Sequence, residues 1–314
     1  MMRRHPFIFG LTMLLAATAS LAGPLAYVPN EKSGTISVID TATDRVTEEI
    51  KAGDRPRGLV VSRDGKLIYV SNQPRSLNII DLATRASAGK IELGQSPEGV
   101  GISPDGKWVV IAVEESNSVA FIDTAGNKLS ANVKVQGKNP EHAIFSPDGQ
   151  WLYVSSEEGS GIDIIDARSR KQIASLTLGA RPRGIAFLPD GSRAYVAAEE
   201  ANTVYSIDTA KQTVLKTIKA GVRSNGVTMR PDGKRVYISN GGEATVSVID
   251  TATDTVIATV PVGTRPWNMA ITPDGKKLYV ANGRSNSVSV IDTETNKKLT
   301  DITVGELPWG VVIR

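Results

Sequence analysis

The sequence predicts an all-β protein, a seven-bladed β-propeller with four-stranded antiparallel blades, because three short markers repeat along the chain. An Ile-Asp pair occurs seven times at spacings of 41 to 43 residues. An Asp-Gly turn lies between successive pairs, and Gly-x-x-Pro or a close variant follows each pair. Self-similarity at this period is typical of propellers and solenoids.

Each repeat contains four short runs of alternating apolar and polar residues. One follows Gly-x-x-Pro, one holds Tyr-Val as in 278–282, one ends in Ile-Asp as in 287–292, and one resembles 255–260. Gly, Pro, Asn and Asp separate these runs, a pattern that predicts strands joined by tight turns. Apolar residues do not recur at helical spacing, so a helical solenoid is disfavoured. Four strands in about 42 residues are typical of a propeller blade.

The two ends of the chain complete one blade. The first run, at 27–30, is of the second-strand type, and the last, at 310–314, is of the first-strand type. We therefore expect the N- and C-terminal strands to pair in one blade and close the ring, which removes exposed sheet edges.

The N-terminal segment predicts export. Residues 1–22 combine Arg3 and Arg4, an apolar run and small residues at a cleavage position, so we interpret them as a signal peptide and 23–314 as a single propeller domain. Polar residues interrupt the run, which disfavours the alternative that this segment is a membrane anchor. We expect no membrane anchor after signal cleavage. Loss of the two arginines lowers the formal net charge from +3 to +1, which gives no basis for nucleic-acid binding. We expect a periplasmic location.

The chain contains no cysteine, which excludes several kinds of site. Disulfides, thiolate metal sites and covalent haem of the C-x-x-C-H type all need cysteine. The mature chain has one histidine, His142, and no cysteine, so a catalytic triad built on serine or cysteine is disfavoured.

The repeat resembles the YVTN-repeat propeller family. The similarity lies in Tyr-Val-Ser-Asn at 69–72, Tyr-Val-Ala-Asn at 279–282 and Ile-Asp-Thr-Ala-Thr at 249–253, and it extends over 27–314. Seven such repeats behind a signal peptide resemble the periplasmic propellers of pyrroloquinoline-quinone (PQQ)-dependent catabolism. That resemblance implies an accessory role beside a quinoprotein alcohol-oxidation system, with a quinoprotein dehydrogenase, a cytochrome or an ABC transporter component as partner. The signature is degraded in the middle repeats, where Val113, Ser156 and Ala198 replace its asparagine.

One face of the ring, here called the mouth face, should carry the functional residues. The loop before each innermost strand and the loop after each second strand share this face, whereas the Asp-Gly and Asp-Thr-Ala-Thr turns lie opposite and are interpreted as structural. The residue after each Gly-x-x-Pro should ring the channel. These ring residues are Arg57, Glu98, Glu141, Arg183, Asn225, Trp267 and Trp309. The next position holds glycine in five repeats but His142 and Asn268 in the other two, which adds both to the predicted channel-mouth site.

Three consecutive repeats carry paired acids after the second strand. The pairs are Glu114 and Glu115, Glu157 and Glu158, and Glu199 and Glu200. Clustered carboxylates suit a hard cation such as Ca²⁺ or a lanthanide, although strand alternation should turn one member of each pair away. The alternatives are a solvated rim of acids and arginines, a docking surface for a basic redox partner, or a site for a small anion at the arginines and tryptophans.

The preferred hypothesis is a non-catalytic binding propeller. A metal-dependent lactonase is the alternative, because Glu98, Glu141, Asn225 and Asn268 have side chains suited to a channel Ca²⁺.

Overall fold

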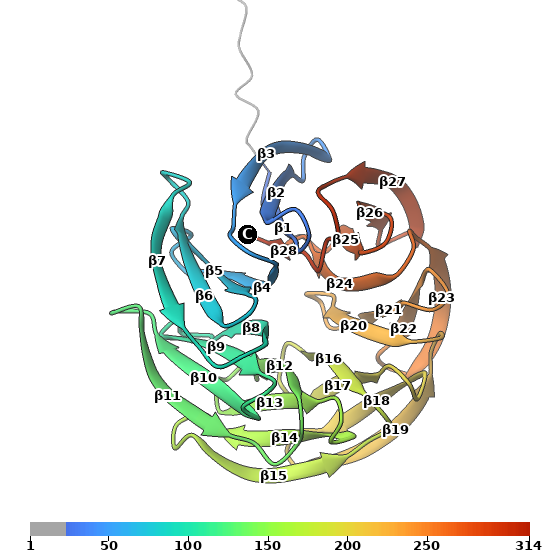
Figure 1. The fold of residues 1–314 in the computed structure, drawn as a ribbon. Coiled ribbons are helices and arrows are strands. Elements are labelled where there is room, and N and C mark those ends of the chain that lie inside the picture. Colours follow the sequence, from blue (N-terminus) through green and yellow to red (C-terminus); the bar gives the residue numbers. More distant parts are fainter. Residues whose placement is uncertain (1–22) are drawn as a thin grey trace, which may run out of the picture.

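The computed structural model describes residues 23–314. It confirms seven sheets of four antiparallel strands, arranged in a ring around a central axis (Figure 1). The predicted signal peptide, residues 1–22, lies outside the described residues. No helix in the described part of the chain is long and apolar enough to cross a membrane.

Each blade has the same order from the channel outward, and we number the blades 1 to 7 along the ring. The innermost strands are β28 (Val312–Ile313), β4 (Pro56–Val61), β8 (Pro97–Ile102), β12 (Pro140–Phe145), β16 (Pro182–Phe187), β20 (Ser224–Met229) and β24 (Pro266–Ile271). The second strands are β1 (Leu25–Asn30), β5 (Leu67–Asn72), β9 (Trp108–Val113), β13 (Trp151–Ser156), β17 (Arg193–Ala198), β21 (Arg235–Asn240) and β25 (Lys277–Asn282).

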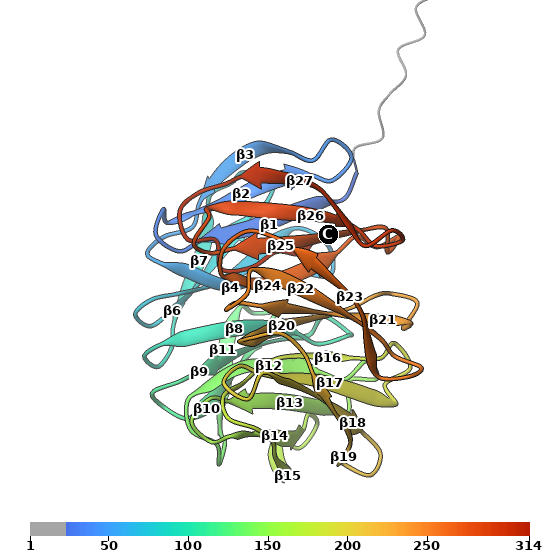
Figure 2. The same ribbon diagram turned by 90° about the vertical axis from the view of Figure 1, so that its right-hand side faces the viewer.

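The outer half of each blade is a hairpin. The third strands are β2 (Thr35–Asp40), β6 (Ser76–Asp81), β10 (Ser118–Asp123), β14 (Gly161–Asp166), β18 (Thr203–Asp208), β22 (Thr245–Asp250) and β26 (Ser287–Asp292). The outermost are β3 (Arg45–Lys51), β7 (Ser87–Glu92), β11 (Lys128–Lys134), β15 (Lys171–Thr177), β19 (Thr213–Lys219), β23 (Thr255–Pro261) and β27 (Lys297–Thr303). Viewed from the side, the connecting loops lie on two opposite faces of the disc (Figure 2).

The chain ends meet in blade 1, as the sequence predicts. Strand β28 pairs with β1 through Ala26 with Ile313 and Tyr27 with Val312. The backbone N–H of Leu25 donates to the carbonyl of Arg314 at 2.8 Å, and that of Arg314 donates to Leu25 at 2.9 Å. The C-terminal strand therefore closes the ring.

The hydrophobic core is divided among seven clusters, each between two neighbouring blades. In one of them Val28 and Ile39 of blade 1 pack against Tyr279 and Val288 of blade 7, and all four are buried. Side chains alternate along each second and third strand, so that both sheet faces contact a neighbouring blade. This packing makes the ring rigid and fixes the loops of the mouth face.

A buried asparagine ends the second strand in four blades, and in three of them, at Asn72, Asn240 and Asn282, it holds the mouth loop of its own blade. Asn282 accepts from the N–H of Gly263 at 3.1 Å and donates to Ser289 at 2.9 Å. Asn240 makes the matching contacts with Gly221 and Ser247. These asparagines, with Asn30 and Asn72, are buried and serve the fold rather than the channel.

Candidate ligand site at the channel mouth

A cavity of about 240 Å³ opens on the mouth face, and all seven predicted ring residues line it. The Gly-x-x-Pro loops explain this placement, because the proline starts the innermost strand in five blades and the side chain after it lines the cavity. We call this cavity the channel mouth. Asn268 also lines it.

The first member of each glutamate pair faces the channel and the second faces solvent. Glu114 and Glu157 line the channel mouth, and Glu199 is buried beside it. The partners Glu115, Glu158 and Glu200 are exposed. Strand alternation therefore turns the second member of each pair away from the cavity, as expected from the sequence for one of the two.

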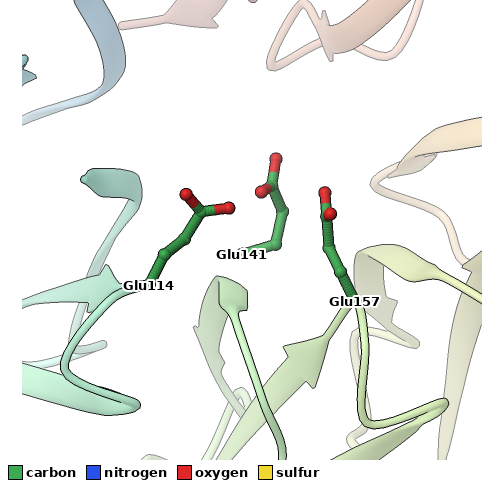
Figure 3. Close-up of side chains that lie close together, drawn as sticks. All are labelled: Glu114, Glu141 and Glu157. Carbon is green, nitrogen blue, oxygen red and sulfur yellow. The ribbon is translucent and has the colours of Figure 1, made fainter.

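Three carboxylates from three elements converge. Glu114 follows β9, Glu141 lies on β12 and Glu157 follows β13, and one oxygen of each lies within 4.8 Å of the other two (Figure 3). The hypothesis placed Glu141 in the ring and omitted it from the metal ligands. In the structure Glu141 lies between the other two, because an innermost strand begins at the mouth face, where the second strands end.

Arginines pair with the carboxylates of the channel mouth, including two of these three. Arg57 contacts Glu98, and its Nη2 lies 3.2 Å from Glu31. Arg183 contacts Glu157, lies 2.6 Å from Glu141 and donates from Nε to Glu199 at 3.0 Å. The solvated rim weighed from the sequence does not describe this arrangement, since these groups are largely buried.

A second set of arginines lies in an unusual backbone position. The residue before each proline, or its Ser224 equivalent, has a positive φ, including Arg181 at 62° and Arg265 at 56°. Glycine or asparagine adopts this conformation more easily than arginine does. Arg265 donates to Glu199 at 2.7 Å, and Arg181 lies 3.0 Å from Glu157.

The carboxylates fall into two electrostatic classes. Burial raises the pKa of Glu157 to about 7, with a further contribution from Glu141, and burial raises the pKa of Glu114. Burial and Glu141 together raise the pKa of Glu98 well above its usual value. Burial opposes ionisation of Glu141 and Glu199 too, but the nearby arginines hold the pKa of both below the usual value. The channel mouth thus has more acids than its arginines neutralise.

His142 lies deeper than the sequence predicts. Its ring stacks on Trp309 at a centroid distance of 5.7 Å, and it lines a lower, mostly apolar cavity of about 160 Å³ rather than the channel mouth. Burial lowers its pKa. Neither ring nitrogen has a hydrogen-bond partner of normal geometry within residues 23–314, although Asn268 is near enough to favour the protonated ring.

Sequence reasoning identified the position after the second strand in three blades and missed its equivalents in the other four. The residue after each second strand is Glu31, Gln73, Glu114, Glu157, Glu199, Gly241 and Gly283. Glu31 lines the channel mouth, and Gln73 donates to Glu98 at 3.1 Å. Alignment of all seven second strands would have revealed both.

Comparison with known families supports the fold and divides the chain among related models. A model of the seven-bladed β-propeller lactonases matches residues 165–308, a choice-of-anchor I domain matches 72–215, and a YNCE-like β-propeller matches 22–102. Each covers less than half of the chain. No curated protein has significant sequence similarity to it.

Solved structures share the architecture over nearly the whole chain. A structure of hydrazine synthase from Kuenenia stuttgartiensis has 24% identity and a TM-score of 0.79, covering 90% of this chain and 99% of the other. A protein of unknown function from Desulfotomaculum acetoxidans has 17% identity and a TM-score of 0.81, covering 92% and 98%. Dihydro-heme d1 dehydrogenase NirN has 15% identity and a TM-score of 0.71, covering 92% and 74%. The chain is a seven-bladed β-propeller, similar in sequence to the YNCE-like and lactonase propeller families.

Proposed function

We propose that the protein is a non-catalytic binding propeller whose channel mouth takes a hard cation, Ca²⁺ or a lanthanide. The observation that carries this proposal is the convergence of Glu114, Glu141 and Glu157 within 4.8 Å. Hard cations take six or more oxygen ligands, and carboxylates are the strongest that a protein offers.

The charge of the channel mouth supports the same conclusion. Six glutamates contact or line it, namely Glu31, Glu98, Glu114, Glu141, Glu157 and Glu199. Five arginines line it or contact these glutamates, namely Arg55, Arg57, Arg181, Arg183 and Arg265. With all of them ionised, six negative against five positive charges leave an excess of one, which a cation would balance; the raised pKa of Glu98 and of Glu157 shows how strongly the site disfavours this excess without a cation. Buried charge without a partner is strongly unfavourable, so this excess favours cation binding.

Arg183 is the group with which an ion must compete. Its Nη1 contacts both Glu141 and Glu157, while its Nε is held by Glu199. Because Glu199 holds Nε, the guanidinium of Arg183 can stay in place when an ion binds Glu141 and Glu157 instead.

The test is calorimetric titration of chelator-treated residues 23–314 with Ca²⁺ and La³⁺. We expect saturable binding that weakens at least about tenfold in Glu114→Gln and in Glu157→Gln, because each removes one charged ligand. The matched controls are Glu115→Gln and Glu158→Gln, which change the outward member of each pair and should bind normally. Absence of heat with both ions, or equal losses in all four variants, would overturn the proposal.

We place this binding function in the periplasm, beside a quinoprotein alcohol-oxidation system and its ABC transport components. Support comes from the sequence resemblance and the signal-like segment at 1–22. The outward glutamates Glu115, Glu158 and Glu200 supply an exposed acidic rim for a basic periplasmic partner. Fractionation of the native host tests the location. Recovery from the periplasm would support the location but not the partner, whereas retention in the cytoplasm would contradict both the location and a periplasmic partner.

A second candidate is a metal-dependent lactonase, favoured by the family match at 165–308. The same cation would polarise a lactone carbonyl and lower the pKa of a bound water. Acid release from a panel of lactones, with and without Ca²⁺, distinguishes the two functions. Turnover lost in Glu157→Gln but kept in Glu158→Gln would favour the enzyme, whereas cation binding without turnover favours the binding protein.

A further inference from the structure

The channel mouth is larger than an ion needs, and its far wall is built from different chemistry. The part of the cavity of about 240 Å³ formed by blades 6, 7 and 1 holds Asn225, Trp267, Asn268 and Trp309 together with Arg265, whereas most of the glutamates come from the other blades. A single water-sized occupant needs about 10–15 Å³ of comparable space. Indole faces give nothing to a hard ion, so this wall points to an organic occupant.

The sequence makes room for Trp267 and Arg265 by removing side chains. Gly283 occupies the position that holds Glu114 or Glu157 in other blades, and a Cβ there would lie 2.7 Å from the Trp267 ring. A Cβ at Gly241 would lie 2.9 Å from Nη1 of Arg265. Both groups are thereby kept at the cavity wall.

Two polar side chains on this wall have unused hydrogen-bonding capacity. Asn225 is only 4% exposed and lines the cavity, yet its amide makes no hydrogen bond within the described part of the chain. An amide that lines the cavity and has no protein partner can donate to and accept from a ligand there. Arg265 donates to Glu199 from Nη2, and its other nitrogens have no acceptor among residues 23–314.

The metal site itself leaves positions to fill. Three carboxylates supply three to six oxygens, whereas Ca²⁺ takes six to eight. Glu114, Glu141 and Glu157 line the same cavity as Trp267 and Asn225, so further ligands of the ion can come from that cavity. The bound ion also removes the excess negative charge that would otherwise repel an organic anion.

We propose that the channel mouth binds its cation together with a small cyclic or aromatic hydroxycarboxylate. This inference rests on the proposed cation-binding function. The hydroxyl and one carboxylate oxygen complete the shell of the ion held by Glu114, Glu141 and Glu157. The carboxylate accepts from Arg265 and Asn225, and the ring packs against Trp267 and Trp309.

The test measures Ca²⁺ binding by equilibrium dialysis, with free Ca²⁺ fixed by electrode because the probes themselves bind the ion. Mandelate offers a ring, a hydroxyl and a carboxylate, phenylacetate lacks the hydroxyl, and lactate lacks the ring. We expect mandelate to raise the Ca²⁺ affinity at least about tenfold, a coupling in the usual range between two sites. Phenylacetate and lactate should each give a clearly smaller increase.

Two independent variants locate the organic subsite. Trp267→Leu should keep the affinity for Ca²⁺ alone, and both Trp267→Leu and Asn225→Ala should lose most of the increase due to mandelate. The matched control is Trp151→Leu, at the start of β13 on the opposite face, which should behave as the unchanged protein. An undiminished increase in both variants would overturn the proposed subsite.

The outcomes separate the two proposals. Binding of Ca²⁺ with no increase from mandelate would refute the hydroxycarboxylate and leave the cation-binding function intact. No Ca²⁺ or La³⁺ binding under any condition would refute both.

Discussion

Single buried residues tie the mouth loops to their blades, and Asn282 shows how. It is fully buried, accepts from Gly263 and donates to Ser287 and Ser289. We expect Asn282→Ala to lower the free energy of unfolding by about 1–3 kcal/mol, because the N–H of Gly263 is left without an acceptor. Urea unfolding measures this change.

The control for this prediction is an exposed asparagine. Asn132 on β11 is exposed, and Asn132→Ala should change the free energy of unfolding by no more than about 0.5 kcal/mol. Equal effects of the two variants would contradict a structural role for the loop contact.

At this scale the sequence predicted positions better than contacts. Gly-x-x-Pro fixes the register of each innermost strand, so Arg57 and Trp267 could be placed at the channel from spacing alone. The interleaving of Arg183 with Glu141 could not, since it depends on side-chain reach across neighbouring blades. The depth of His142 depends on Trp309 covering it, which no repeat position indicates.

Between elements, the tyrosines of three second strands, Tyr69, Tyr195 and Tyr279, link their blade to the next. Tyr195 on β17 donates to Asp254 in the β22–β23 turn at 2.6 Å, and Tyr69 donates to Asn127 at 2.6 Å in the same way. The hydroxyl of Tyr153 on β13 is buried but has no partner among the described residues. Tyr195 and Tyr153 are therefore equivalent tyrosines with and without a hydrogen-bond partner, and a comparison of the two tests the link.

We expect Tyr195→Phe to lower the free energy of unfolding by about 1–3 kcal/mol, because it removes a hydrogen bond to a carboxylate and leaves Asp254 partly unpaired. Tyr153→Phe should be neutral or stabilising, because it removes a buried hydroxyl that nothing satisfies. Thermal unfolding of the two variants gives the comparison. A larger loss for Tyr153→Phe would contradict the proposed link.

The arrangement of elements was accessible from the sequence because every blade repeats the same signals. Because the pattern occurs seven times, a local exception such as Ser224 in place of proline does not obscure it. The types of the first and last strands predicted the closure of blade 1. The direction of each glutamate in a pair was harder, because alternation predicts that one turns away without saying which. The structure assigns the first of each pair, Glu114 for example, to the channel.

For the whole molecule, the turn aspartates predict the response to acid. Hydrogen bonds from turn residues lower the pKa of aspartates in most blades, as the Thr253 N–H does for Asp250 and the Ser103 hydroxyl does for Asp105. A pKa lowered in the folded state stabilises the fold above the unfolded value of about 3.9, and this contribution is lost as the pH falls through the folded value.

We therefore expect the urea midpoint of unfolding to fall steeply between about pH 4.5 and pH 2.5. Asp250→Asn should reduce this dependence slightly, since one of many such groups is removed. A midpoint that stays constant over this range would contradict the prediction.

The closure of blade 1 has a consequence for the order of the blades. Leu25 and Arg314 exchange two backbone hydrogen bonds, so the chain can be joined there by a short linker without moving either strand. New ends could then be opened in an Asp-Gly turn such as 274–275, on the face opposite the channel mouth. Such a circular permutant would keep every blade beside its present neighbours and therefore the same channel mouth. The ligand site depends on the cyclic sequence of the blades and not on which of them is synthesised first.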